Sequence, residues 1–297
     1  MHDSILDYRG FRYLWVALIL SIGSIVAYVW HDPIGVPNGG SWLGYTLGTI
    51  GALLILWLLW FGIRKRRYSG GSGTARGWLS AHVYLGTTLI LIAFLHAGFQ
   101  VGWNIHTLAL VLMLLVIFSG FFGVYAYLRY PAMMTRNRAD TTRDAMLAEI
   151  RELDQQTLQL ADKVDKSIHD AILSSIQHTQ LGGGVWTQLS ARDDSGLALA
   201  KLKEAVLKSE TGEKSSKSGQ TMVMMVDFLA NQATDAQSEN LRRLIDLVSR
   251  KRALAARVAR DIQLQALMEI WLYIHVPLSL GLLGALTAHV VAVFFYW

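Results

Sequence analysis

Long uncharged apolar stretches constrain this chain more than any other feature. A helix needs about 20 apolar residues to cross a bilayer, and four stretches reach that length. The stretch from Gly77 to Leu128 is long enough for two helices, with a break near Gly98 to Asn104, so five transmembrane helices are predicted. The predicted spans cover roughly residues 13–30, 42–63, 79–100, 106–128 and 270–296.

The distribution of charge predicts the orientation of these spans. Lys and Arg gather before the first span, after the second and after the fourth, whereas the loop from His31 to Ser41 contains neither. The positive-inside rule therefore predicts a cytoplasmic N-terminus and a C-terminus on the far side. The expected location is the bacterial inner membrane, with the C-terminus in the periplasm. The net charge is +5, and much of the excess of Lys and Arg over Asp and Glu lies in these membrane-flanking segments. This placement indicates membrane lipid as a partner and argues against a nucleic acid.

The segment from 131 to 269 interrupts the apolar pattern and holds most of the charged residues. It separates residues 1–130, with spans one to four, from residues 270–297, with the fifth span. Two helical stripes of apolar residues predict a long cytoplasmic hairpin of coiled-coil-like helices, with Pro131 marking a bend at its start. The stripes comprise Ile150, Leu153, Leu160, Val164, Ile168, Ile172 and Ile176, then Leu241, Leu244, Val248, Ala255, Val258 and Ile262.

The part of this insert between the two stripes has a different composition. Gly182 to Gly184 are expected to end the outgoing helix, a shorter helix is expected over Leu197 to Lys208, and a flexible loop over Ser209 to Gly219. The apolar run from Met222 to Leu229 is expected to cap the hairpin tip rather than dock a partner.

Two predicted spans carry histidine pairs with the same separation. His82 and His96 lie in the third span, and His275 and His289 lie in the fifth, with a step of 14 residues in each. That step is ~21 Å along a helix and close to four turns, so both histidines of a span lie on nearly one face. Both helices are expected to run in the same direction. His82 and His275 then form an inner pair, and His96 and His289 form an outer pair.

This arrangement favours two haem groups over a bare metal ion. Zinc or non-haem iron requires three or four protein ligands close together, but each level supplies only two imidazoles. Two axial imidazoles complete an iron whose other ligands come from a porphyrin, and such an iron favours electron transfer. The alternative is that the four histidines only hydrogen-bond between helices. The chain has no cysteine, so it cannot itself ligate an iron–sulfur cluster.

The spacing His82-X13-His96 and His275-X13-His289, on two parallel spans separated by one, resembles the di-haem membrane cytochrome b superfamily. It is similar to cytochrome b of bc-type complexes and to the membrane domain of ferric reductases and NADPH oxidases. The resemblance implies an all-α membrane protein whose four-helix bundle holds two haems b, with His82 and His275 as the inner and His96 and His289 as the outer iron ligands. The Pro-Glu-Trp-Tyr quinol motif of bc-type proteins is absent, and so is a Gly-rich dinucleotide loop.

Three further residues are candidates for cofactor binding. His106, at the outer start of the fourth span, is placed to meet an outer haem propionate or a quinone headgroup, or to reach interfacial water. Arg76 and Arg129 lie at the expected cytoplasmic edge, where they could pair with inner haem propionates. The positive-inside rule is the alternative explanation for both arginines.

These features favour an electron-transfer subunit of an oxidoreductase complex. The two haems would relay electrons across the membrane between a partner subunit, an iron–sulfur protein or a flavoprotein docked on the insert, and a quinone pool or another acceptor. Two alternatives belong to other classes: a haem-containing transmembrane sensor, and a structural or assembly subunit. The sequence leaves the direction of electron flow and any enzymatic activity of this chain undecided.

Overall fold

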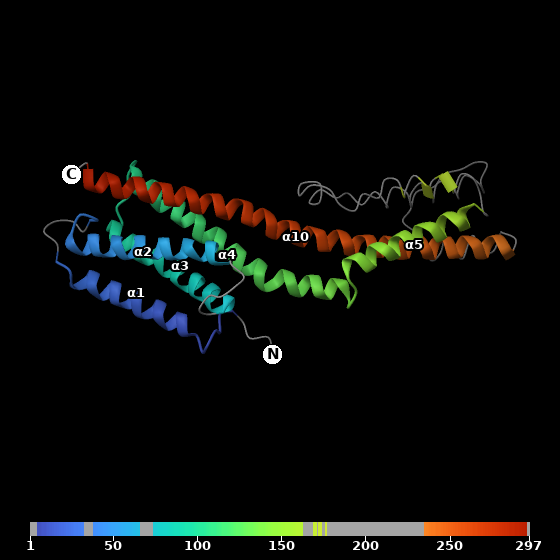
Figure 1. The fold of residues 1–297 in the computed structure, drawn as a ribbon, viewed down its shortest axis with the longest axis horizontal. Helices are drawn as coiled ribbons and strands as arrows, with labels where there is room; N and C mark the ends of the chain where they lie inside the picture. Colours follow the sequence, from blue (N-terminus) through green and yellow to red (C-terminus); the bar gives the residue numbers. More distant parts are fainter. Residues whose placement is uncertain are drawn as a thin grey trace, which may run out of the picture. The chain divides into compact units, whose positions relative to one another are not determined.

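The structure is a computed structural model that describes residues 5–32, 38–65, 74–162, 169–170, 172–173, 176 and 235–295. These residues form helices joined by short connections, and there is no strand among them (Figure 1). The main helices are α1 (Arg12–Trp30), α2 (Trp42–Lys65), α3 (Ala75–Ala97), α4 (Ile105–Arg138), α5 (Arg143–Ala161) and α10 (Asp235–Phe295).

Five of these helices, all except α5, are long and apolar enough to cross a membrane. The predicted helical class with five candidate spans is therefore confirmed. The predicted break in the longest apolar stretch is confirmed as well, since α3 ends at Ala97 and α4 begins at Ile105. The expectations for residues 177–234, which include the glycine run, the shorter helix and the flexible loop, lie outside the described residues.

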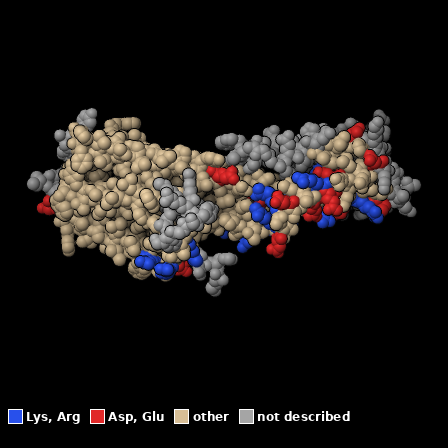
Figure 2. Space-filling model, viewed as in Figure 1, with Lys and Arg blue, Asp and Glu red and all other residues tan. Residues whose placement is uncertain are grey.

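The chain divides into two compact units. The first comprises Met1–Tyr127 and Trp271–Trp297 and is called the bundle unit below; the second comprises Leu128–Ile270 and is called the hairpin unit. Helices α4 and α10 contribute to both units, because each runs from an apolar part into a charged part. Charged side chains gather over the charged part of α10 and over α5, while the apolar helices show almost none (Figure 2).

Apolar side chains hold the bundle unit together in two clusters. One joins α1, α2 and α3, which run beside one another (Figure 1), and centres on Ile92, whose exposed fraction is 0%. The other joins α2, α3, α4 and α10 around Leu89, Met113 and Leu282. The outward apolar side chains are exposed, as expected for helices whose outer surface faces lipid. The second cluster brings the two histidine-bearing helices, α3 and α10, into one bundle.

In the hairpin unit, α5 packs against the first half of α10. Met146, Ile150 and Leu153 of α5 form one buried cluster with Leu254, Ala255 and Val258 of α10. The contacts run in opposite directions along the two helices, so the pair is antiparallel. The predicted stripes are thereby confirmed at Ile150, Leu153, Ala255 and Val258, and Leu244 is fully buried as well.

The outgoing helix of the hairpin unit is interrupted at a place the sequence pattern did not indicate. Pro131, where a bend was predicted, lies inside α4, which continues to Arg138; the bend itself stays a prediction. The chain leaves the helix at Ala139 and Asp140, whose φ angles are 47° and 63°, a left-handed conformation that is costly for residues other than glycine. Helix α5 then starts after Thr142, whose side chain accepts a hydrogen bond from the backbone N–H of Ala145.

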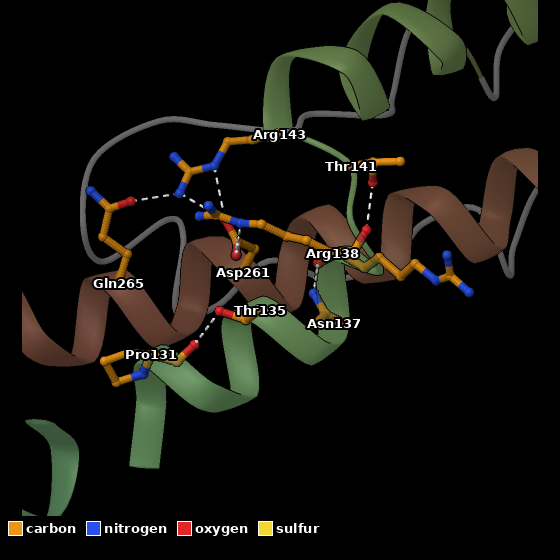
Figure 3. Close-up of polar contacts among 9 residues, drawn as sticks. Pro131, Thr135, Asn137, Arg138, Thr141, Arg143, Asp261 and Gln265 are labelled. Atoms are coloured by element: carbon orange, nitrogen blue, oxygen red, sulfur yellow. Dashed lines mark hydrogen bonds and ion pairs between the residues drawn. The ribbon is translucent and has the colours of Figure 1, made fainter. Parts of the chain in front are cut away.

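A buried carboxylate, that of Asp261, binds one residue on each side of this interruption (Figure 3). Asp261 of α10, with an exposed fraction of 0%, accepts hydrogen bonds from Arg138 at the end of α4 and from Arg143 at the start of α5. Arg138 binds it with two nitrogens, each at 2.8 Å, and Arg143 also donates to Gln265 at 2.6 Å. Burying a single carboxylate without partners is very costly, and two guanidinium groups offset that cost. Asp261 therefore fixes the path of the chain where two consecutive residues, Ala139 and Asp140, adopt the left-handed conformation.

The two arginines also determine how Asp261 titrates. Burial by itself raises the pKa of this carboxyl, but the hydrogen bonds and charges of Arg138 and Arg143 outweigh burial, so the pKa lies below its ordinary value of 3.8. The same contacts raise the pKa of Arg138, chiefly through its hydrogen bond to Asp261. Asp261 and Arg138 therefore stay ionised at neutral pH.

Replacing Asp261 with Asn should destabilise the hairpin unit, because a neutral amide leaves two guanidinium groups without a counter-charge. We expect a loss of about 2–3 kcal/mol, measured by thermal or denaturant unfolding of the detergent-solubilised protein followed by helical circular dichroism. The control is Glu239→Gln on the same helix, where the pair with Arg243 is exposed and the loss should stay under about 1 kcal/mol. Equal losses in the two variants would refute the role given to Asp261.

Stability should also depend on pH through this group. Because the folded-state pKa of Asp261 is lowered, its contribution is complete above the unfolded-state pKa, about 3.9, and is lost as the pH falls through the folded value. We therefore expect the difference in unfolding midpoint between the native chain and Asp261→Asn to be constant from pH 7 to pH 5 and to shrink below pH 4. A difference that grows as the pH falls would contradict the direction of the shift.

Candidate functional site

The four histidines predicted as ligands lie on two helices of the bundle unit. His82 and His96 are on α3, and His275 and His289 are on α10. All four side chains are half-buried. An imidazole within an apolar helix needs a specific partner for its nitrogens, since lipid offers none. The contacts of each ring therefore indicate what it is positioned to do.

The outer pair is brought together. The ring centres of His96 and His289 are 6.0 Å apart, and the rings are nearly perpendicular at 82°. A third histidine, His106 at the start of α4, lies closer to His289, with 4.3 Å between ring centres. Sequence spacing predicted that His96 and His289 lie at one level, and the structure adds the contact of His289 with His106.

A backbone carbonyl of α2 fixes the proton of His96. Nδ1 of His96 lies 2.7 Å from the carbonyl oxygen of Gly44. A carbonyl oxygen can only accept a hydrogen bond, so Nδ1 must carry the proton. In the neutral imidazole the lone pair is then on Nε2, which is the state needed for that nitrogen to ligate a metal.

The same ring also requires the absence of a side chain at Gly48. A Cβ atom at that position would lie 2.7 Å from Cε1 and 2.9 Å from Nδ1 of His96. Real Cβ contacts are longer, so an alanine there would push the ring away. Gly44 and Gly48, one helical turn apart on α2, thus form the seat of His96.

A hydroxyl of α4 fixes the proton of His275 in the inner pair. Nδ1 of His275 lies 2.6 Å from Oγ of Ser119. The single hydroxyl proton of Ser119 is donated to the carbonyl oxygen of Val116 at 2.9 Å. The hydroxyl therefore accepts from His275, Nδ1 carries the proton, and Nε2 again holds the free lone pair.

Trp271 packs beside this hydrogen bond. Its Nε1–H donates to the backbone carbonyl of Ser119 at 2.7 Å, and its ring centre is 5.3 Å from that of His275. The indole lies where a Cβ at Gly123 of α4 would be, so only glycine admits it. Helices α4 and α10 therefore meet at a small-residue surface of α4 that orients His275.

His82, the other member of the inner pair, faces both α2 and α10. It interacts with the backbone of Leu58 on α2 and lies near enough to His275 for the two rings to interact electrostatically. His82 thus lies near His275, and His96 lies beside His289. The two levels are separated along α3 and α10 by four helical turns.

Two observations are compatible with a haem iron held between paired histidines. Metal–imidazole bonds are about 2 Å long, so two imidazoles on opposite sides of one iron have ring centres roughly 6 Å apart, which is close to the 6.0 Å between His96 and His289. His96 and His275, whose Nδ1 atoms donate hydrogen bonds to oxygens, each present an unprotonated Nε2 in the neutral state.

A bare metal ion is not suggested by the described part of the chain. Among residues 5–32, 38–65, 74–162 and 235–295 and the few described between them, no group of three or more His, Asp or Glu side chains is arranged to hold one. The inner level has two histidines, while at the outer level His106 contacts the ring of His289 and also interacts electrostatically with His96.

The remaining predicted site residues are less closely tied to the pairs. Arg76 is half-buried at the start of α3, six residues before His82. Arg129 is exposed on α4 and belongs to the hairpin unit. Their assignment to haem propionates stays a prediction. His106 contacts the ring of His289 and is also exposed, so it can reach water as well.

Sequence reasoning missed the residues that orient the ligands. Ser119, Gly123 and Trp271 at the inner level, and Gly44 and Gly48 at the outer level, carry no metal-binding chemistry of their own. One signal was present: glycines spaced by one turn in the second and fourth spans indicate close approach by another group. The sequence does not show which side chain packs against each glycine, because that depends on how the helices pack together.

No protein-family model, no curated protein and no solved structure matches the chain. Its function is therefore inferred from the residues themselves. The resemblance to membrane cytochromes stays a prediction made from histidine spacing.

Gly48→Ala should disturb the outer pair, since the added methyl group would overlap the ring of His96. We expect a destabilisation of about 1–3 kcal/mol, typical of overpacking, measured as the unfolding midpoint in detergent. The control is Gly23→Ala in α1, where the added methyl meets nothing within 4 Å. That variant should be neutral or gain up to about 1 kcal/mol from helix propensity. If both variants behave alike, Gly48 does not seat His96.

Proposed function

We propose that this protein is a membrane cytochrome that holds two haems b, with His82 and His275 as the inner and His96 and His289 as the outer axial ligands. In this proposal α2, α3, α4 and the last part of α10 form the haem-holding bundle. The supporting observation is that the Nδ1–H groups of His96 and His275 each donate a hydrogen bond to an oxygen, which leaves Nε2 free to bind iron.

Haem, when bound, supplies a one-electron carrier that the protein side chains cannot provide. The chain's own residues supply two imidazoles per iron, which leave no open coordination position and so favour electron transfer over oxygen binding. Four helical turns separate the two levels, about 21 Å along each helix, so a pair of haems would connect the two sides of the bilayer.

The proposed physiological role is to relay electrons across the membrane between a partner redox subunit and a quinone pool or another acceptor. The hairpin unit, with its charged surface, is the proposed docking region for the partner, an iron–sulfur protein or a flavoprotein (Figure 2). The proposed setting is the bacterial inner membrane, with the hairpin in the cytoplasm. The basic segments that flank the apolar helices support this orientation.

A structural role is the competing candidate, and one observation favours it. The contacts of His96 with Gly44 and of His275 with Ser119 join different helices, so they could serve only to hold the bundle together. That role explains neither the equal spacing of the two pairs nor the 6.0 Å between the rings of His96 and His289. The two candidates differ in haem content.

The first test is the haem content of the purified protein, expressed with adequate haem supply. A pyridine haemochrome assay and a reduced-minus-oxidised absorption spectrum should give two b-type haems per chain. His275→Leu should remove the inner haem and His96→Leu the outer, each leaving about one haem and one component of the spectrum. The control is His169→Leu, which replaces a histidine paired with Asp162 in the hairpin unit and should leave both haems. A native chain without haem would favour the structural role.

A further inference from the structure

Ser119 uses its hydroxyl and its backbone carbonyl to hold the inner ligand. Its hydroxyl accepts from Nδ1 of His275 at 2.6 Å and donates to the carbonyl oxygen of Val116 at 2.9 Å. Its backbone carbonyl accepts from the indole of Trp271 at 2.7 Å. One residue of α4 thus connects to two residues of α10, which are themselves one helical turn apart.

The surroundings make this set of contacts rigid. The indole of Trp271 fills the space left by Gly123, and its ring lies against that of His275 at an angle of 35°. No lipid group competes for these hydrogen bonds, because the hydrocarbon core offers neither donors nor acceptors. Rotation of the His275 ring would break its hydrogen bond and press it against the indole. The ring orientation and the Nδ1 proton of His275 are therefore fixed by the same three residues.

We propose that Ser119 is a positioning residue for the inner haem and, together with Trp271, forms a clamp that sets the reduction potential of that haem separately from the outer one. The inference rests on the proposed cytochrome function. It goes further, because it assigns the tuning of one of the two haems to named residues that do not touch the iron.

The direction of the effect follows from the chemistry of the ligand. An acceptor on Nδ1–H makes the imidazole a stronger electron donor through Nε2, and a stronger donor favours the oxidised iron. The Ser119 hydroxyl thus lowers the potential of the inner haem. At the outer level the acceptor is the backbone carbonyl of Gly44, which does not change when Ser119 is replaced. The outer haem is therefore an internal reference in the same molecule.

The test is an optical redox titration of the full-length native chain and of Ser119→Ala in detergent, with electron paramagnetic resonance of the oxidised state. The components are first assigned with His275→Leu and His96→Leu. In Ser119→Ala the midpoint potential of the inner haem should shift upward and its resonance signal should change, while the outer haem keeps both. Ser119→Thr retains a hydroxyl and should restore the native potential.

Two further variants separate positioning from structural damage. Ser24→Ala removes another buried serine hydroxyl bonded to a helix carbonyl, that of Leu20 at 2.8 Å, far from the histidines in sequence, and should change neither haem. Trp271→Phe retains an aromatic ring but removes the N–H donor to Ser119, and should shift the inner haem in the same direction by a smaller amount. It also tests the clamp if Ser119→Ala does not fold.

The outcomes are distinct. Loss of the inner haem from Ser119→Ala, with the outer haem retained, supports the clamp as well. Unchanged potentials and signals of both haems in Ser119→Ala, or equal shifts in both, overturn it while the cytochrome function stands. A native chain that binds no haem overturns the proposed function itself.

Discussion

The hydrogen bonds that satisfy imidazole nitrogens between apolar helices are the interactions on which the bundle depends. Lipid provides no donors or acceptors, so each polar ring in α3 and α10 must find its partner on another helix. His96 finds the carbonyl of Gly44 on α2, and His275 finds the hydroxyl of Ser119 on α4. These partners fix which nitrogen carries the proton, and hence which nitrogen is available to a metal.

Small residues make these contacts geometrically accessible. The ring of His96 occupies the space of a missing side chain at Gly48, and the indole of Trp271 occupies that at Gly123. The bundle thus combines large, oriented aromatic groups on α3 and α10 with glycines on α2 and α4. The hairpin unit is stabilised differently. Helices α5 and α10 bury an apolar stripe between them, and the ionised Asp261 is held by two arginines.

Much of the helical architecture could be predicted from the sequence, because hydropathy and periodicity are local properties. The candidate spans, the break between Ala97 and Ile105 and the buried stripe of α10 follow from residue order alone. The interruption at Ala139 and Asp140 could not be predicted. It has no glycine or proline signal, and it exists because Asp261, more than a hundred residues later, holds both arginines that flank it.

The sequence by itself determined which residue types lie at equal depth: two histidines on each of two helices, four turns apart, because helical rise is the same in every helix. Only the tertiary structure decided that His96 faces His289 at 6.0 Å, that His106 joins them, and that Ser119, Trp271 and Gly48 orient the rings. The physical reason is that proton position and ring orientation depend on acceptors from other helices, and the rotation of one helix against another is set by packing that no single segment encodes.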